Sequence, residues 1–120
     1  MAHLLNLQTF VDDRGNLTVI EKILPFDIKR VYYIYSVDKS LRGGHRHQRT
    51  VQAAICISGS CTISSHDGEK EEDFILDHPE KCLILETRDW HTMHTFSEDA
   101  VLLVLASEYF DREDYIFTKY

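Results

Sequence analysis

The segment GGHRHQRTVQAAICISG (residues 43–59) carries the pattern that decides the fold. His45 and His47 stand two positions apart, and residues two apart on a β-strand project from the same face of a sheet. Arg46 projects from the opposite face unless the strand bulges. Because imidazoles on an inner face are unfavourable without partners, the pair indicates a functional pocket. The alternative is a pair of exposed strand histidines.

Strand-like runs rich in β-branched and aromatic residues follow one another along most of the chain. Turn residues such as Arg42-Gly43-Gly44 separate them, and Asp67-Gly68 is a strong hairpin signal. The runs recur about every ten residues, a rhythm typical of a sandwich or barrel. We therefore predict an all-β fold with a single helical turn in the tail at 109–117. The predicted strands lie within residues 16–21, 30–37, 50–65, 72–77, 81–86, 91–96 and 100–110.

Side-chain alternation predicts what some of these strands contact. Residues 101–105 are apolar on both faces, which predicts a central strand covered on both sides. Tyr33 and Tyr35 share one face of their strand and Tyr32 lies on the other, so one face is expected to line a cavity or an interface. The three cysteines show no pairing pattern, which indicates a reducing compartment and small apolar fillers in the core.

Composition limits the classes of function. The chain has 120 residues, 43% of them hydrophobic, which suits one domain over residues 1–120 that pairs with a copy of itself. The formal net charge of -7 and the lack of a dense Lys/Arg patch argue against nucleic acid as a partner. MAHLLNLQTF lacks the features of a signal peptide, and no apolar run is long enough to cross a membrane. We expect a cytoplasmic protein without a membrane partner.

The spacing after the histidine pair resembles the first motif of the cupin barrels. Four residues separate His47 from Gln52, and six more separate Gln52 from Gly59. Gln52 stands where metal-binding cupins usually have Glu, and an amide oxygen is a weaker ligand for a transition metal than a carboxylate. The pattern therefore favours a metal-free site in which a neutral imidazole carries a proton. His91 or His94 could supply a further donor, so a metal site stays open as an alternative.

Longer segments resemble the nucleotide-sugar 3,4-ketoisomerases, a cupin family, over residues 10–116. The segments are RGGHRH (42–47), IKRVYYIY (28–35), SGS (58–60), Trp90 and FSEDAVLLVLASEYFDREDYI (96–116). The resemblance implies a cupin jelly-roll (double-stranded β-helix) barrel, a strand-exchanged homodimer and no cofactor. It also implies dTDP-4-keto-6-deoxyglucose as substrate, with the keto group moved from carbon 4 to carbon 3. A PLP-dependent 3-aminotransferase would act next, towards 3-amino-3,6-dideoxyhexoses of bacterial surface polysaccharide such as O-antigen or S-layer glycan.

The resemblance also implies roles for individual residues. His45 would be the base, with His47 beside it and Arg42 at the entrance to the strand. The reaction passes through an enediolate, whose negative oxygens need preorganised donors; Tyr32, Arg30 and His47 are candidates. The remaining binding candidates are Arg30, Arg42 and Arg49 for the diphosphate, and Trp90 for the sugar or thymine. Position 46 is commonly small in this family, and here it is Arg.

Two further residues bear on stereochemistry. Family members that give a galacto product have an Arg near the start of the chain and a His directly after the Trp, whereas members that give a gluco product have Tyr and Arg there. Arg14 and His91 match the galacto pattern. The alternatives are a cupin epimerase on a related dTDP-4-keto sugar, a non-catalytic ligand-binding cupin, and a metal-dependent cupin dioxygenase.

Overall fold

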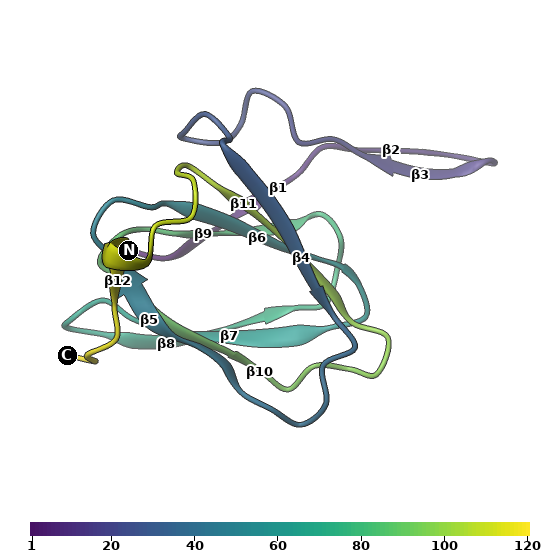
Figure 1. Ribbon diagram of the computed structural model, residues 1–120. Helices are drawn as coiled ribbons and strands as arrows, with labels where there is room; N and C mark the ends of the chain where they lie inside the picture. Colours follow the sequence, from purple (N-terminus) through teal and green to yellow (C-terminus); the bar gives the residue numbers. More distant parts are fainter.

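The computed structural model describes residues 1–120 and consists almost entirely of β-strands. Two five-stranded antiparallel sheets form two layers that face each other (Figure 1). The first has the order β1 (His3–Asn6), β9 (Lys81–Leu85), β6 (Gln52–Ser58), β11 (Val101–Ala106) and β4 (Arg30–Tyr35). The second has the order β12 (Tyr115–Ile116), β5 (Arg42–His47), β10 (Trp90–His94), β7 (Cys61–His66) and β8 (Glu71–Leu76).

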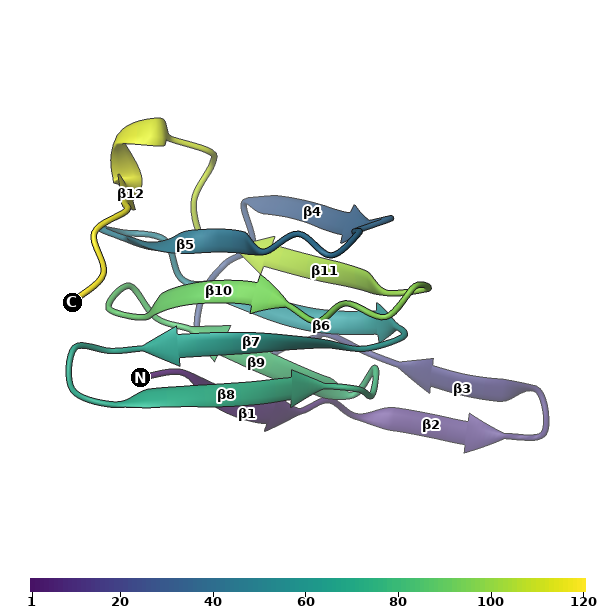
Figure 2. The same ribbon diagram turned by 90° about the horizontal axis from the view of Figure 1, so that it is seen from below.

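A separate hairpin of β2 (Thr9–Asp12) and β3 (Gly15–Thr18) extends away from the two sheets (Figure 2). It exposes Phe10, Val11 and Leu17, which are 54%, 73% and 57% accessible to solvent. Apolar side chains of this size on a projecting hairpin have no partner within the same chain. They are therefore available to another surface.

The all-β prediction is confirmed, and the helical turn predicted in the tail is the 3₁₀ turn η1 (Arg112–Asp114). The jelly-roll prediction is also confirmed, although hydrogen bonds do not join the two sheets into a closed barrel. The predicted run 16–21 ends as a strand at Thr18. The strands β1, β2 and β12 lie outside the predicted runs, as does β5, of which only the part around His45 and His47 was expected to be a strand. No helix has the length and apolar character that crossing a bilayer requires.

The main core lies between the two sheets and is built by the predicted alternation. In β7, Cys61 and Ile63 are buried, whereas Thr62 and Ser64 are only partly covered. A second buried cluster covers the outer face of the first sheet, where Leu105 packs with residues of the 20–26 loop. The strand β11 therefore has buried side chains on both faces, as predicted. Cys56, Cys61 and Cys82 are all free and buried, as predicted for apolar fillers.

The glycine pair before the histidines is not the turn that the sequence predicts. Gly43 and Gly44 lie inside β5, both with φ of +85°, a conformation that side chains with a Cβ rarely adopt. The register slips by one residue here, because His45 pairs with His91 while Gly43 pairs with Thr92. A Cβ on Gly43 would lie 2.9 Å from the carbonyl oxygen of His91. The pair is therefore a β-bulge that lets β5 approach β10 closely.

Candidate active site

Three histidines meet at one end of the space between the sheets. His45 and His47 come from β5 and His91 from the neighbouring strand β10. The ring centroid of His45 lies 4.9 Å from the ring centroid of His47 and 4.9 Å from that of His91. The ring centroids of His47 and His91 are 6.1 Å apart. His91 is fully buried and His47 is 5% exposed. The prediction that His45 and His47 share an inner face is therefore confirmed.

Burial keeps these imidazoles neutral. Desolvation is the main cause that lowers the pKa of each of the three histidines to about 4. The neighbouring imidazoles add to the effect, whereas the carboxylate of Asp114 acts in the opposite direction on the pKa of His47. A neutral imidazole has one nitrogen with a free lone pair, which is the form that a general base needs.

The tautomer of His91 follows from its backbone contact. Nδ1 lies 3.0 Å from the carbonyl oxygen of Asp89, and a carbonyl can only accept, so Nδ1 is the protonated nitrogen. The lone pair therefore resides on Nε2, which is buried and has no hydrogen-bond partner. In its neutral state His91 presents an acceptor, not a donor, to its surroundings.

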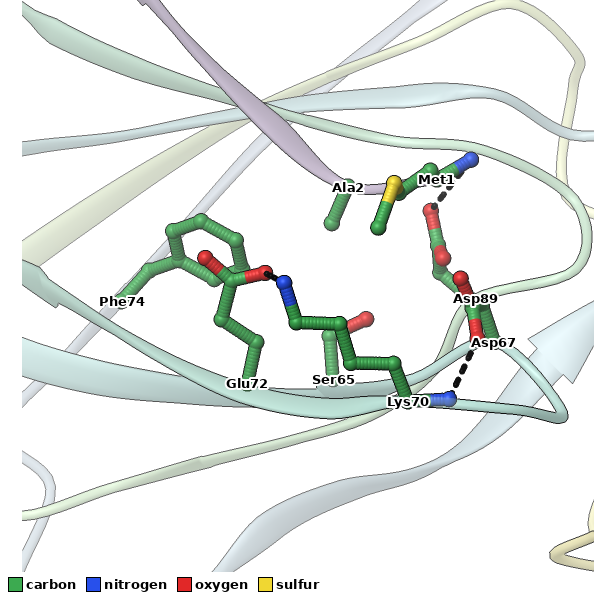
Figure 3. Close-up of a pocket in the computed structure, with 8 residues that line it drawn as sticks. All are labelled: Met1, Ala2, Ser65, Asp67, Lys70, Glu72, Phe74 and Asp89. Atoms are coloured by element: carbon green, nitrogen blue, oxygen red, sulfur yellow. Dashed lines mark hydrogen bonds and ion pairs between the residues drawn. The ribbon is translucent and has the colours of Figure 1, made fainter.

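The loop before β10 is fixed next to the amino terminus (Figure 3). Asp89 is 1% exposed, and its Oδ2 accepts a 2.8 Å hydrogen bond from the backbone of Glu86. The amino group of Met1 lies 3.8 Å from the same oxygen and also pairs with Glu86. The cavity beside them measures about 10 Å³, room for roughly one water molecule. This region positions His91 through Asp89, and it has no space for a sugar.

A larger cavity of about 350 Å³ opens beside His45. Tyr32 faces it from β4, whereas Tyr35 on the same strand is 62% exposed on the outer face of the sheet. The guanidinium carbon of Arg30 lies 4.5 Å from the centroid of the Tyr32 ring. Burial is the main cause that raises the pKa of Tyr32. The lining is Arg30, Tyr32, Tyr33, Ile34, Arg42, Gly43, His45, Met93 and Tyr115.

The tail completes the cavity with a residue that the sequence interpretation missed. The ring of Tyr115 lies 4.6 Å from His45 and 4.8 Å from His47, measured between centroids. Tyr115 pairs with His47 in the β12–β5 ladder. Asp114 holds this segment in place, because its carboxylate accepts from the backbone of Gln48 and Arg49 and from the hydroxyl of Thr50. A buried acidic residue in a turn-forming segment is a weak signal, so neither residue was identified from sequence.

The structure places Arg42, Arg49 and Trp90, which were predicted to bind substrate, in different surroundings. Arg42 lines the cavity, as expected for its place at the start of β5. Arg49 instead pairs with Asp111 at 2.8 Å. Trp90 lies on the face of β10 opposite to His91, and its Nε1 donates to the carbonyl of Phe117 at 3.1 Å.

Arg14 is also outside this cavity, near the tip of the β2–β3 hairpin, where its side chain is 88% exposed and pairs with Asp12. Arg46 points away from the histidines, as predicted, and its guanidinium carbon lies 4.2 Å from the ring centroid of Tyr120. Within one chain, the structure therefore brings together His45, His47 and His91, with Tyr32, Arg30 and Arg42 around them. It does not bring Arg14, Arg49 or Trp90 to the same cavity.

Two facing antiparallel sheets with a histidine pair at the cavity between them define a cupin of the jelly-roll class. The family model described as "FdtA: WxcM-like, C-terminal" matches residues 1–120, and the chain belongs to this family. A curated relative from Aneurinibacillus thermoaerophilus, TDP-4-oxo-6-deoxy-alpha-D-glucose-3,4-oxoisomerase, is 43% identical over 115 residues, which is 93% of this chain and 83% of the relative.

Solved structures agree with the family. The QdtA 3,4-ketoisomerase from Thermoanaerobacterium thermosaccharolyticum, a double mutant in complex with TDP, is 46% identical with a TM-score of 0.93, covering 98% of this chain and 87% of its own. The WlaRB TDP-quinovose 3,4-ketoisomerase from Campylobacter jejuni is 42% identical with a TM-score of 0.93, covering 98% of this chain and 92% of its own. The protein is therefore an isomerase.

Proposed function

We propose that this protein is a TDP-sugar 3,4-ketoisomerase that converts dTDP-4-keto-6-deoxy-D-glucose to a dTDP-3-keto-6-deoxyhexose. The observation that carries the proposal is the group of neutral imidazoles beside a cavity that also holds Tyr32 and Arg30. The name of the curated relative specifies this substrate, and the QdtA structure contains TDP. Arg30 and Arg42 line the cavity and supply positive charge for the diphosphate.

The mechanism we propose is a metal-independent proton transfer. His45 takes the hydrogen on carbon 3, which the neighbouring carbonyl acidifies, and the electron pair moves to the carbonyl oxygen on carbon 4. Tyr32 and Arg30 stabilise the enediolate by donating to its oxygens. Carbon 4 then receives a proton, the carbon 3 hydroxyl loses its proton as that oxygen becomes the new carbonyl, and the oxygen on carbon 4 gains a proton to become the new hydroxyl. One C–H bond and one O–H bond break, and one of each forms.

The product is proposed to have the galacto configuration. His91 would deliver the proton to carbon 4 from the side opposite to His45. Since its Nε2 carries a lone pair when neutral, His91 must first take up a proton, and His45, 4.9 Å away between centroids, is its nearest source. Among the similar solved structures, one enzyme is named for TDP-quinovose, which has the gluco configuration, and another for TDP-fucose, which has the galacto configuration. The proton spectrum of the product decides, because the hydrogen on carbon 4 is equatorial in the galacto sugar and axial in the gluco sugar.

The protein is proposed to act as a strand-exchanged homodimer of single-domain chains. The β2–β3 hairpin projects from the body and exposes three large apolar side chains, Phe10, Val11 and Leu17. A second copy would cover them, and Arg14 near the tip would then reach the partner's cavity. This arrangement gives Arg14 a catalytic position that its own chain does not provide.

The proposed context is deoxysugar biosynthesis in the cytoplasm. A 3-keto sugar is the substrate that a PLP-dependent 3-aminotransferase requires, so such an enzyme is the expected functional partner. The amino sugar would enter bacterial surface polysaccharide, such as lipopolysaccharide O-antigen or S-layer glycan. The net charge of -7 is unfavourable for a role on nucleic acid.

The direct test is incubation with dTDP-4-keto-6-deoxyglucose, a matched 3-aminotransferase and a chelator. The proposal expects a 3-amino sugar nucleotide. An epimerised 4-keto sugar would favour the epimerase alternative, and thermal stabilisation without turnover would favour a binding protein. His45→Asn is expected to abolish turnover while it leaves TDP binding largely intact, with His78→Asn, a change at an exposed histidine, as the matched control. Near-normal turnover in His45→Asn would remove His45 as the base.

A further inference from the structure

Gln52 lies next to Tyr32 at the candidate active site, and the proposed mechanism gives it no role. It begins β6 and is 1% exposed, with its side chain on the inner face that Ala54 and Cys56 share. Its Nε2 donates a 3.0 Å hydrogen bond to the hydroxyl of Tyr32, and this is the side chain's only hydrogen bond. Tyr32 itself faces the cavity beside His45.

The contact crosses an intervening strand. Gln52 is on β6 and Tyr32 on β4, with β11 between them. Ala106 of β11 lies opposite both Gln52 and Arg30 in the two registers. The small methyl group of Ala106 leaves the space over β11 open, so that the two side chains can meet there.

The direction of this hydrogen bond decides what Tyr32 can do. A tyrosine hydroxyl has one proton to donate and lone pairs that accept. Because the amide N–H of Gln52 occupies a lone pair, the proton of Tyr32 stays free for another acceptor. The charged and titratable groups that line the cavity with Tyr32 are Arg30, Arg42, His45 and Tyr115, besides the exposed Tyr33. The arginines can only donate, and the Tyr32 hydroxyl makes no hydrogen bond to His45 or Tyr115, so its proton is available to a substrate oxygen in the cavity.

We propose that Gln52 is a positioning residue of the isomerase: its amide N–H holds the hydroxyl of Tyr32 so that the Tyr32 proton is donated to the oxygen of the enediolate. The inference rests on the proposed function. It also gives a reason for an amide at this position of the cupin motif. A carboxylate can only accept, so Glu would capture the Tyr32 proton and withdraw it from the substrate.

The test is a double-mutant cycle with Gln52→Glu and Tyr32→Phe, assayed with dTDP-4-keto-6-deoxyglucose in the presence of a chelator. Each single change is expected to lower kcat by roughly 10²-fold, the loss that follows removal of one oxyanion donor. The double variant is expected to lose no more than the worse single variant, because both changes remove the same donor. KM should change little, and thermal unfolding is measured on every variant because a carboxyl at a residue that is 1% exposed lowers stability. Gln8→Glu makes the same substitution at an exposed residue and should retain full activity.

The pH profile separates positioning from a structural role. Below the pKa of the introduced carboxyl, the acid form can donate to Tyr32, so activity of Gln52→Glu should rise as the pH falls until the histidines protonate. Additive losses in the cycle, or wild-type activity in Gln52→Glu, would overturn the inference. If Gln52→Glu does not fold, Gln52→Met removes the same donor, and its cycle with Tyr32→Phe gives the same decision. A wild-type protein that does not convert the sugar would instead reject the proposed function itself.

Discussion

The pH dependence of the isomerase should reveal how deeply its proposed base, His45, is buried. Burial lowers the pKa of His45 and His47 to about 4. At pH 5 a group with a pKa of about 4 is about 90% neutral, whereas a histidine with an ordinary pKa of about 6.5 is about 3% neutral. If both imidazoles must be neutral, about 80% of the enzyme stays competent at pH 5. The rate should therefore stay nearly flat from pH 8 down to about pH 5.

The measurement is kcat/KM against pH, because this ratio reports the ionisation of the free enzyme. The nucleotide sugar has no group that titrates between pH 4 and pH 8, so an acid limb in this range belongs to the protein. Exchange of the carbon 3 hydrogen with deuterated water follows the proton abstraction alone. An acid limb with its midpoint at about pH 6 or above would refute the reasoning, since it would mean that the base is solvated like an ordinary histidine.

Folding stability must be measured on the same samples, because the same shifts make it depend on pH. The native pKa of each of these histidines is below the unfolded value, so the unfolded chain binds more protons as the pH falls below about 6.5. Their contribution to stability is complete above that pH and is lost progressively down to about pH 4. Thermal unfolding monitored by circular dichroism should follow this course. It also shows whether the enzyme is still folded where activity falls.

Three other predictions follow from particular contacts. Gly43→Ala should lower the free energy of unfolding, measured by chemical denaturation, by about 1–3 kcal/mol, because the new Cβ would lie 2.9 Å from a backbone oxygen. Gly44→Ala should lower it less, because Gly44 has the same φ but its Cβ would have its nearest neighbour at 3.9 Å. Asp114→Asn should lower the free energy of unfolding by about 1–3 kcal/mol and also lower kcat, because it weakens the contacts that hold Tyr115 over the histidines. A variant with the stability and kcat of the wild type would contradict this prediction. A mixture of inactive Arg14→Ala and His45→Asn should regain up to about one quarter of wild-type activity if Arg14 serves the partner's cavity, and should stay inactive if it does not.

Much of the fold follows from local alternation. The period-two geometry of a strand accounts for three predicted features: the inner face of β5, the two covered faces of β11, and the opposite orientations of Tyr32 and Tyr35. The same rule explains why Trp90 does not line the cavity beside His45 in this chain. Trp90 and His91 are adjacent on β10, and adjacent residues on a strand face opposite sides of the sheet. Both could not line one cavity.

Other features depend on contacts that a single sequence does not reveal. Gly43-Gly44 has the composition of a turn, and only the register against β10 shows that it is a bulge. Tyr115 reaches the histidines because the tail reverses and pairs with β5, about 70 residues earlier in the chain. The exposed position of Arg14 likewise has no local cause. The role proposed for Arg14 requires that the hairpin meets a second copy.

A pKa of about 4 in the free enzyme raises the question of how His45 can act as a base at all. The low value reflects the cost of an isolated imidazolium in a buried site, and in the reaction that charge is never isolated. The proton transfer that charges the imidazole also places negative charge on the enediolate oxygens, so the two charges appear together. In surroundings of low polarity their attraction is much stronger than in water. In the proposed mechanism, the burial that keeps His45 neutral at rest would therefore strengthen the ion pair that forms in the transition state, whose negative side Tyr32 and Arg30 are proposed to stabilise.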